Sequence, residues 1–345
     1  MKKKLEIWGS LPEPYGGVSV HVQRLILALG NYDNVKLINF STGKQIINQK
    51  NIKKGKSFFN ELLRVIFRKN IMVHLHSNRL IVLLLFSLLK KNNYIVTLHN
   101  KRFLNFDSSK KQLFLASLKK ARYVFSNDDE VHEILMQKKI NTIKVPAFLP
   151  PISHKQKIKL PEEFIIFRNK YRYVFSLSIY GFNYLDNDDY GLKKIIALLK
   201  KINNPTVGFC LCISQPNLPD LEQFINDAKK EGIKNNLLLL INKIANGSDI
   251  WAQSDAFLRL NNTDIEGLSV KEALLLNVPV LASNVCSRPK DAIVYDVKDS
   301  SDLESKFADL VENLEIYKEE LRKSNKSDIV SALDIIQPIY RKVLK

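Results

Sequence analysis

The sequence is built from short apolar runs that alternate with longer segments of helical periodicity, almost from end to end. Parallel strands joined by crossover helices give this pattern, because parallel neighbours in a sheet need a long connection between them. In the first half we expect helices between strands at 5–8, 35–40, 72–75, 94–98, 123–126 and 142–145, the clearest helix being 18–29. The chain is therefore predicted to be an α/β protein with parallel sheets.

Prolines interrupt the alternation once, at positions 146, 150, 151 and 161, just before a charged stretch. Such clusters are typical of a connection between domains, and 345 residues exceed what one hydrophobic core usually supports. A second series follows, with strands expected at 173–177, 206–213, 236–240, 256–260 and 278–282, and helices at 189–201, 219–231, 248–253 and 269–276.

We therefore expect two Rossmann-like domains, at 1–150 and 172–325, joined by a linker at 151–171. The chain from Ser301 onward is expected to be helical, and its last part, 326–345, to pack back on the N-terminal domain, with a kink or a restart at Pro338. Sheets of this class bind ligands at the carboxyl ends of their strands. The two domains are thus expected to face each other across a cleft that holds the active site.

The positive charge is concentrated in the first half of the chain. Residues 1–150 contain 26 Lys and Arg and 9 Asp and Glu, so they carry 26 − 9 = +17 of the net charge of +18. An anionic membrane surface, a phosphorylated carrier or a nucleic acid would be attracted to such a domain. General lysine-rich usage that only solvates the surface explains the same count, so both interpretations stay open.

Several classes of protein are disfavoured by composition. Three cysteines do not form a disulfide framework, and no cluster of His, Cys or carboxylate residues has metal-site spacing; His74 and His76 are expected at a strand end. The most apolar run, 80–89, is shorter than the roughly 20 residues that span a bilayer, so we expect a buried helix. No signal peptide is apparent. We therefore expect a cytoplasmic protein without a structural metal ion.

The stretch 264–283 combines a glycine turn, a helix start and a buried strand. Gly267 allows a tight turn, Ser269 is a favourable helix N-cap, and Glu272 follows at capping-box spacing. Asn277 is expected to end the helix in a left-handed turn. A helix start after a glycine turn offers unpaired N–H groups to a phosphate, although a purely structural cap explains the same residues. The candidate diphosphate-binding residues are Gly267, Leu268 and Ser269.

A second glycine turn lies between the first strand and the helix at 18–29. Gly16 and Gly17 would let the backbone approach a ligand at the start of that helix. The turn lacks the Lys-Ser/Thr pair of a P-loop, so a nucleotide hydrolase is disfavoured.

The chain resembles the GT-B-fold glycosyltransferases of the large retaining family (glycosyl transferases group 1, family 4-like) that includes many bacterial surface-polysaccharide enzymes. The likeness runs through both domains. The most specific segment is 259–273, where Asp264 and Glu272 reproduce the family's acidic residue, seven intervening residues and glutamate; Glu266 is out of this register. The other places are Gly16-Gly17 with His21, Thr97-Leu-His99-Asn100, 145–151, and Ser287-Arg-Pro289.

The resemblance implies roles for individual residues. Glu272 would bind the ribose hydroxyls, Asp264 would face the donor sugar near the reacting carbon, and His99 would contact that sugar. The amides of Leu268 and Ser269 would hold the diphosphate together with Gly16 and Gly17; the substrate-binding set also includes His21 and Arg259. The family commonly has an Arg and a Lys for the diphosphate where this chain has Ser178-Ile-Tyr-Gly181 and Tyr190-Gly-Leu-Lys193. The candidates to replace them are Arg259, Lys193 and Arg288.

The implied reaction is hexosyl or related transfer from a nucleotide-diphosphate sugar to a glycan hydroxyl, with retention of configuration and without a metal ion or cofactor. The acceptor would be lipid-linked, in bacterial surface polysaccharide synthesis, and the basic domain would lie on the inner face of the cytoplasmic membrane. A nucleotide-sugar epimerase of the same fold is the enzyme alternative. A basic protein that binds nucleic acid or membrane is the alternative from another class, but no nucleic-acid motif is present, so nucleic acid is not an expected partner.

Overall fold

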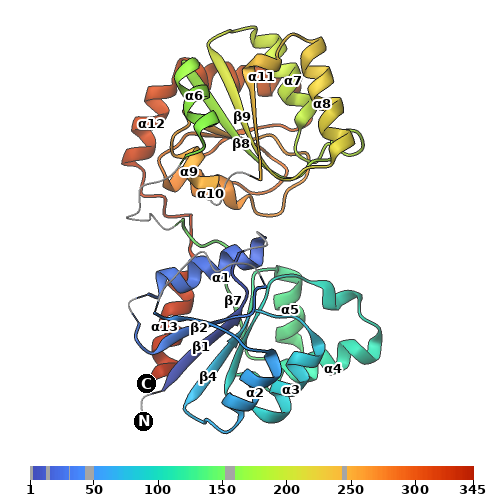
Figure 1. The fold of residues 1–345 in the computed structure, drawn as a ribbon, viewed down its shortest axis with the longest axis vertical. Helices are drawn as coiled ribbons and strands as arrows, with labels where there is room; N and C mark the ends of the chain where they lie inside the picture. Colours follow the sequence, from blue (N-terminus) through green and yellow to red (C-terminus); the bar gives the residue numbers. More distant parts are fainter. Residues whose placement is uncertain (1–2, 13–15, 31, 43–49, 152–159, 243–246) are drawn as a thin grey trace. The chain divides into compact units, whose positions relative to one another are not determined.

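The computed structural model describes residues 3–12, 16–30, 32–42, 50–151, 160–242 and 247–345. The chain divides into two compact units: unit 1 is Met1–Ile152 with Val330–Lys345, and unit 2 is Ser153–Ile329. Each unit contains one sheet, and the labelled elements can be followed in Figure 1. Residues 13–15 of the first glycine loop and 152–159 of the expected linker lie outside the described residues.

The sheet of unit 1 has the strand order β3-β2-β1-β4-β5-β6-β7, and its neighbours pair in parallel. The chain leaves β1 towards β2 and β3 and then returns to the other side of β1 with β4. This reversal creates a topological switch point between β1 and β4. The strands are β1 (Lys4–Gly9), β2 (Val35–Asn39), β3 (Ile52–Lys54), β4 (Ile71–Leu75), β5 (Tyr94–Leu98), β6 (Tyr123–Ser126) and β7 (Thr142–Lys144).

Helices cover both faces of this sheet. On one face α1 (Gly17–Ala28) and α13 (Ala332–Leu344) share a buried cluster, and Figure 1 shows the red α13 beside the blue α1. The other face is covered by α2 (Phe58–Ile66), α3 (Leu80–Leu89), α4 (Ser108–Leu118) and α5 (Asp129–Gln137). A 3-10 turn, η1 (Arg102–Asn105), precedes α4. The last helix runs through Pro338 without the restart that the sequence suggested.

Helix α3 differs from its prediction as a buried helix. Its residues Val82, Leu83 and Phe86 are buried, but Ile81 and Leu88 are exposed, because α3 lies in an outer layer with the sheet on one side only. Within the described residues, none of the helices combines the length and hydropathy needed to cross a lipid bilayer.

Unit 2 repeats the plan with the order β10-β9-β8-β11-β12-β13, again parallel. Its strands are β8 (Tyr173–Gly181), β9 (Val207–Gln215), β10 (Leu237–Ile241), β11 (Ala256–Arg259), β12 (Val280–Ser283) and β13 (Ile293–Tyr295). Its helices, with buried clusters on both faces of the sheet, are α6 (Glu162–Lys170), α7 (Leu192–Ile202), α8 (Leu218–Lys230), η2 (Lys234–Asn236), α9 (Gly247–Trp251), α10 (Leu268–Leu275), α11 (Ser300–Glu312) and α12 (Leu314–Lys323).

The structure adds three elements to the sequence prediction. β3 and β13 are three-residue strands at sheet edges. Helix α6 lies inside the stretch assigned to a linker, 151–171, and its Phe164 and Phe167 are buried in the core of unit 2. That part of the expected linker is therefore an integral element of unit 2. Residues 324–331, between α12 and α13, are not helical, contrary to expectation.

Candidate functional site

The predicted site residues lie at the carboxyl edges of the two sheets. In unit 2 the chain leaves β8 towards β9 and β10 and returns with β11, so β8 and β11 flank the switch point. Ligands of such sheets bind outside the strand ends at this point. The segment that carries most of the predicted residues follows β11 directly.

At this edge the Asp264 carboxylate accepts hydrogen bonds from two arginines. Arg259 donates from Nε to Asp264 Oδ2 at 3.0 Å and from Nη2 to Oδ1 at 3.1 Å, and Arg288 Nη1 donates to Oδ2 at 2.8 Å. The amide of Ile265 also donates to Oδ1, at 3.0 Å. A carboxylate accepts about four hydrogen bonds, so this one is fully engaged. The three charged side chains together carry +1, and we call them the arginine cluster.

The two arginines are anchored to neighbouring strand ends. Arg259 Nη1 donates to the carbonyl of Ser178 on β8 at 3.3 Å, across the switch point. Arg288 Nε donates to the carbonyl of Ser283, the last residue of β12, at 2.9 Å. The Arg288 side chain is 1% exposed and that of Arg259 14% exposed, so Arg259 is the more accessible cation.

Burial opposes the ionised form of Asp264, but the hydrogen bonds and charges of Arg259 and Arg288 outweigh it and hold the pKa below its usual value. Asp264 is therefore an ionised, fixed anchor at neutral pH.

Helix α10 begins beside this cluster. Gly267 is its N-cap, with φ 61° in the left-handed region, and a Cβ there would stand 2.2 Å from Arg288 Nη1. The predicted capping box on Ser269 and Glu272 is therefore wrong: the helix begins at Leu268, so Ser269 is already its second residue. The amides of Leu268 and Ser269 lie where an α-helix has no internal partner for its N–H groups.

The rest of α10 agrees with its prediction. Glu272 is 6% exposed and lies one turn after Ser269. Asn277 has φ 58° and ends the helix in a left-handed turn. Its amide donates to Leu274 O, and that of Val278 to Ala273 O, both at 3.0 Å, which is a Schellman motif.

A pocket of about 410 Å³ opens at the carboxyl ends of β8 and β9. Tyr190, which lines it, lies with its ring centroid 5.8 Å from the Arg259 guanidinium, so the pocket adjoins the arginine cluster. Its volume is within the range of small-ligand sites. Two segments that replace the family's Arg and Lys, 178–181 and 190–193, contribute to its lining, which consists of Tyr180, Gly181, Phe182, Asn183, Asp189, Tyr190, Gln215, Pro216 and Asn217.

The start of α7 is capped by the protein itself. Asp188 accepts hydrogen bonds from the amides of Leu192 at 2.6 Å and Lys193 at 3.1 Å. Lys193 is exposed and lies over the ring of Tyr184, 5.7 Å from its centroid. Of the three candidates to replace the family's cations, only Arg259 and Arg288 thus meet in one cluster.

In unit 1 the helix after β1 carries Gly16, its N-cap, and Gly17, its first residue. The φ of Gly16 is −166°, which any residue adopts, and among the described residues no atom lies within 4 Å of a Cβ built at either glycine. Neither backbone strain nor crowding by these residues requires glycine there. Open space at a helix start leaves room for a ligand to approach the backbone.

Four histidines gather at the carboxyl edge of this sheet. His76 Nδ1 and His99 Nε2 share a hydrogen bond of 2.9 Å, and the ring centroids of His21 and His99 are 5.0 Å apart. His74 packs against His76, with centroids 4.4 Å apart, and bonds Tyr340 Oη of α13. Sequence reasoning placed His74 and His76 at a strand end but missed the contact of His76 with His99. His76 follows β4 and His99 follows β5, and these strands are neighbours.

Burial keeps these histidines neutral. It lowers the pKa of His21 to about 4, against the small opposing effect of its hydrogen bond to Ala147 O, and that of His99 to about 3. Burial also holds the pKa of His74 and His76 well below the usual value. The described residues include no group of three or more His, Cys, Asp or Glu side chains placed to hold a metal ion.

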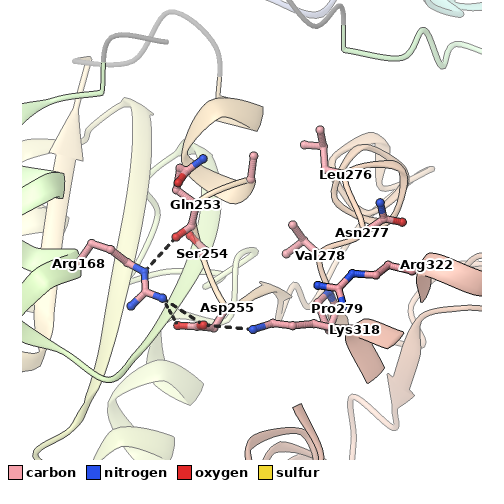
Figure 2. A pocket seen from close by; sticks show the side chains of 11 residues that line it. Arg168, Gln253, Ser254, Asp255, Leu276, Asn277, Val278, Pro279, Lys318 and Arg322 are labelled. Atoms are coloured by element: carbon pink, nitrogen blue, oxygen red, sulfur yellow. Dashed lines mark hydrogen bonds and ion pairs between the residues drawn. The ribbon is translucent and has the colours of Figure 1, made fainter. Parts of the chain in front are cut away.

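Another pocket, of about 420 Å³, lies at the opposite edge of the unit 2 sheet, before β11 and β12. Figure 2 shows Arg168 and Lys318 converging on Asp255, at 3.1 and 3.4 Å. Asp255 also accepts from the amide of Val174 at 2.8 Å, which joins α6, α12 and the start of β8. These ion pairs hold the unit together at the amino ends of the strands, away from the predicted site.

No protein-family model matches the chain, and no curated protein matches it in sequence. Solved structures match it over its whole length. The HepE protein of Anabaena, solved with UDP, is 13% identical with a TM-score of 0.64 over 99% of each chain. A glycosyltransferase of Rickettsia africae is 14% identical with a TM-score of 0.69 over 100% of each.

A third match is an α,α-trehalose-phosphate synthase (UDP-forming) of Burkholderia xenovorans, solved with glucose-6-phosphate. It is 9% identical with a TM-score of 0.65 and covers 99% of this chain and 100% of its own. These likenesses confirm the predicted fold class. The chain has the two-domain α/β fold, GT-B, of these structures.

Proposed function

We propose that the chain is a glycosyltransferase that moves a sugar from a nucleotide-diphosphate sugar to a hydroxyl of a glycan acceptor. The observation that carries this proposal is the arginine cluster beside the start of α10, at the switch point of unit 2. Its net positive charge adds to the positive end of the helix dipole. A departing nucleotide diphosphate requires such a prearranged positive field.

Within this proposal Asp264 positions the arginines and does not touch the sugar. The resemblance implied a contact with the donor sugar, but four hydrogen bonds already occupy the carboxylate. Arg288 is buried and acts through its charge and its hydrogen bond to the Ser283 carbonyl. Arg259 is accessible enough to reach a phosphate.

The nucleoside is proposed to bind between α10 and the pocket at β8 and β9. Glu272 is the acceptor for the vicinal ribose hydroxyls, as the family register implies, and the amides of Leu268 and Ser269 bind phosphate oxygens. Tyr180 and Tyr190, which line the pocket next to Arg259, supply rings for the base.

The residues of unit 1 are proposed to bind the sugar side of the donor. Gly16 and Gly17 offer backbone amides at the start of α1, and His99 is a neutral hydrogen-bonding partner for a sugar hydroxyl. His21 packs against the ring of His99, and His76 shares a hydrogen bond with it. A neutral imidazole suits this task, because a positively charged His99 would compete with the arginine cluster for the diphosphate.

In the proposed reaction the bond between the anomeric carbon and the phosphate oxygen breaks, and a bond to the acceptor oxygen forms with retention. The acceptor proton passes to the departing phosphate oxygen, so the chain supplies positioning and charge stabilisation and no separate base. Arg259, Arg288 and the α10 dipole provide the counter-charge, and the reaction is proposed to be metal-independent.

The classes of donor and acceptor are proposed separately from the binding site. The HepE structure contains UDP and the Burkholderia synthase structure glucose-6-phosphate, so UDP-sugars and sugar hydroxyls are the first compounds to test. A lipid-linked glycan acceptor of bacterial surface polysaccharide synthesis, met at the inner face of the cytoplasmic membrane, is supported by the family resemblance and by the basic first half of the chain.

Calorimetry with UDP and UDP-glucose tests the binding site. Arg259→Gln removes an accessible cation, and losing charge-assisted hydrogen bonds should weaken UDP binding about 10- to 100-fold. Arg168→Gln is the matched control, since Arg168 forms a similar half-buried ion pair at the other edge of the same sheet. Glu272→Gln should weaken binding of UDP but not of pyrophosphate. Equal affinities in the Arg259 and Arg168 variants would reject the site.

Incubation with UDP-sugars, with and without glycan acceptors, tests the reaction. We expect a new glycosidic bond and release of UDP only when an acceptor is present, with the anomeric configuration read by NMR. Interconversion of UDP-sugars without an acceptor would identify an epimerase and overturn the proposal of transfer.

A further inference from the structure

The outward face of α2 is apolar. Phe59, Leu63 and Phe67 are spaced four residues apart, which places them on one side of the helix and of its C-cap residue. They are 62%, 44% and 85% exposed, whereas Leu62 and Val65 on the other side are buried. Large side chains at this spacing usually face a core. On α2 one such row faces the sheet and a second faces away from it.

Helix α3 lies against α2 and also carries exposed apolar side chains. The rings of Phe58 and Phe86 are 6.3 Å apart, and Lys90, the C-cap of α3, donates to the carbonyls of Val65 at 3.1 Å and Arg68 at 2.9 Å. Ile81, Leu88 and Leu89 are exposed on α3, whose sequence from Leu80 to Leu89 contains no charged residue. We call the exposed set the apolar face: Phe59, Leu63, Phe67, Ile81, Leu88 and Leu89.

Basic residues follow the carboxyl ends of the helices in this layer. The exposed Arg68 and Lys69 follow α2, Lys91 follows α3, and Lys119 and Lys120 follow α4. Hydrogen bonds to backbone carbonyls hold these ends together: the side-chain Nδ2 of Asn93 donates to Lys69 O at 3.1 Å, and the backbone N of Asn92 to Lys120 O at 2.8 Å. The five cations are the basic rim, and among the described residues none of them forms an ion pair.

Acidic residues are nearly absent from this part of the chain. Residues 50–122 contain 17 Lys and Arg and 2 Asp and Glu, so their net charge is 17 − 2 = +15. Glu61 is buried and paired with Arg64, and Asp107 is paired with Lys110 and caps α4. Carboxylates outside this range pair with Arg64 (Glu6) and Lys101 (Asp128 and Glu130), but among the described residues none pairs with the basic rim.

We propose that the apolar face and the basic rim form a docking surface for a lipid bilayer that contains anionic lipids. Exposed Phe, Leu and Ile side chains gain by entering the acyl boundary, and adjacent cations gain from the negative surface potential. A second copy of the chain would bring two surfaces of the same charge together. A nucleic acid would match the charge but leave the apolar side chains without partners. The proposal uses none of the residues assigned to sugar transfer.

Vesicle co-sedimentation of the full chain tests this surface. We expect binding to phosphatidylcholine vesicles with about 30% phosphatidylglycerol at about 0.1 M salt, little binding to pure phosphatidylcholine, and weakening at about 0.5 M salt. The variant F59Q/L63Q/F67Q removes apolar side chains, and R68Q/K69Q/K91Q/K120Q removes cations. Each should lower the partition coefficient at least about tenfold. All seven residues are exposed, so both variants should keep the circular dichroism of the wild type.

The variant I165Q/I166Q/L218Q is the matched control, because it removes three comparably exposed apolar side chains from unit 2. It should bind vesicles like the wild type. The proposal is overturned if wild-type chain does not bind anionic vesicles, or if all three variants bind alike. It is also overturned if F59Q/L63Q/F67Q only abolishes a dimer in sedimentation equilibrium, or if the chain retains DNA or RNA through the basic rim while vesicle binding is absent.

Discussion

Replacing Gly267 by alanine tests whether the start of α10 and the arginine cluster are one interlocked unit. The left-handed backbone at φ 61° costs an alanine about 1–2 kcal/mol. The new Cβ would stand 2.2 Å from Arg288 Nη1, so the guanidinium must move. Arg288 is 1% exposed and bonds Asp264 and Ser283, and hydrogen bonds of charged groups are worth about 1.5–3 kcal/mol each. We expect the free energy of unfolding of unit 2 to fall by about 3–5 kcal/mol.

Gly232→Ala is the matched control. Gly232 also has a left-handed backbone, with φ 73°, but no described atom lies within 4 Å of its added Cβ. This variant should lose only the backbone cost of about 1–2 kcal/mol. Urea unfolding followed by tryptophan fluorescence measures both, and a Trp8→Phe background leaves Trp251 as the reporter of unit 2.

A double-mutant cycle with Arg288→Ala isolates the clash. Without the guanidinium, Gly267→Ala should cost no more than Gly232→Ala, so the coupling energy should be about 2 kcal/mol or more. If Gly267→Ala costs the same with and without Arg288, or no more than Gly232→Ala in the wild type, the cluster does not determine the glycine at this position.

Three further perturbations have defined outcomes. The pKa values of about 4 for His21 and about 3 for His99 lie below the unfolded value of about 6.5, so the unfolded chain binds protons first as pH falls. Unit 1 should be fully stable above about pH 6.5 and lose about 1 kcal/mol per buried histidine between pH 7 and 5.5 in urea unfolding followed by Trp8; a pH-independent midpoint would contradict this. Asp188→Ala leaves two amides at the start of α7 without their acceptor and should cost about 1–2 kcal/mol in the Trp251 signal. Asn277→Gly should be nearly neutral and Asn277→Val destabilising by about 1–2 kcal/mol, because glycine tolerates φ 58° and valine does not. Equal urea midpoints for the two variants would refute the left-handed turn at Asn277.

The sequence predicts the sheets well because parallel strands are buried on both faces and therefore read as apolar runs, as in 94–98 and 123–126. Three-residue edge strands give a much weaker pattern: β7 was predicted, whereas β3 and β13 were missed. Helix α6 has charged residues at both ends and was assigned to a linker; its burial depends on a core formed by distant strands.

The candidate site is predictable in its residues but not in its contacts. The spacing of Asp264 and Glu272 can be read directly, whereas the ion pair of Asp264 with Arg288 joins residues on different loops. The same distant side chain lies beside Gly267, a contact that local capping rules do not take into account; these rules placed the N-cap at Ser269, two residues after the observed N-cap. The sequence pattern predicts the strands but not which of them pair, so it misses the contact between His76 and His99, which follow the paired strands β4 and β5.

Unit 1 is assembled from both ends of the chain, and this sets the order in which the protein is completed during synthesis. Ile336, Tyr340 and Val343 of α13 are buried against the first sheet, whereas unit 2 is complete by Ile329. While the ribosome makes the middle of the chain, the face of β1 that α13 covers remains open to solvent or to chaperones. Unit 2 can therefore finish folding before unit 1, although unit 1 is translated first. Premature termination before residue 330 would leave unit 1 with an open apolar surface, and we expect such fragments to aggregate.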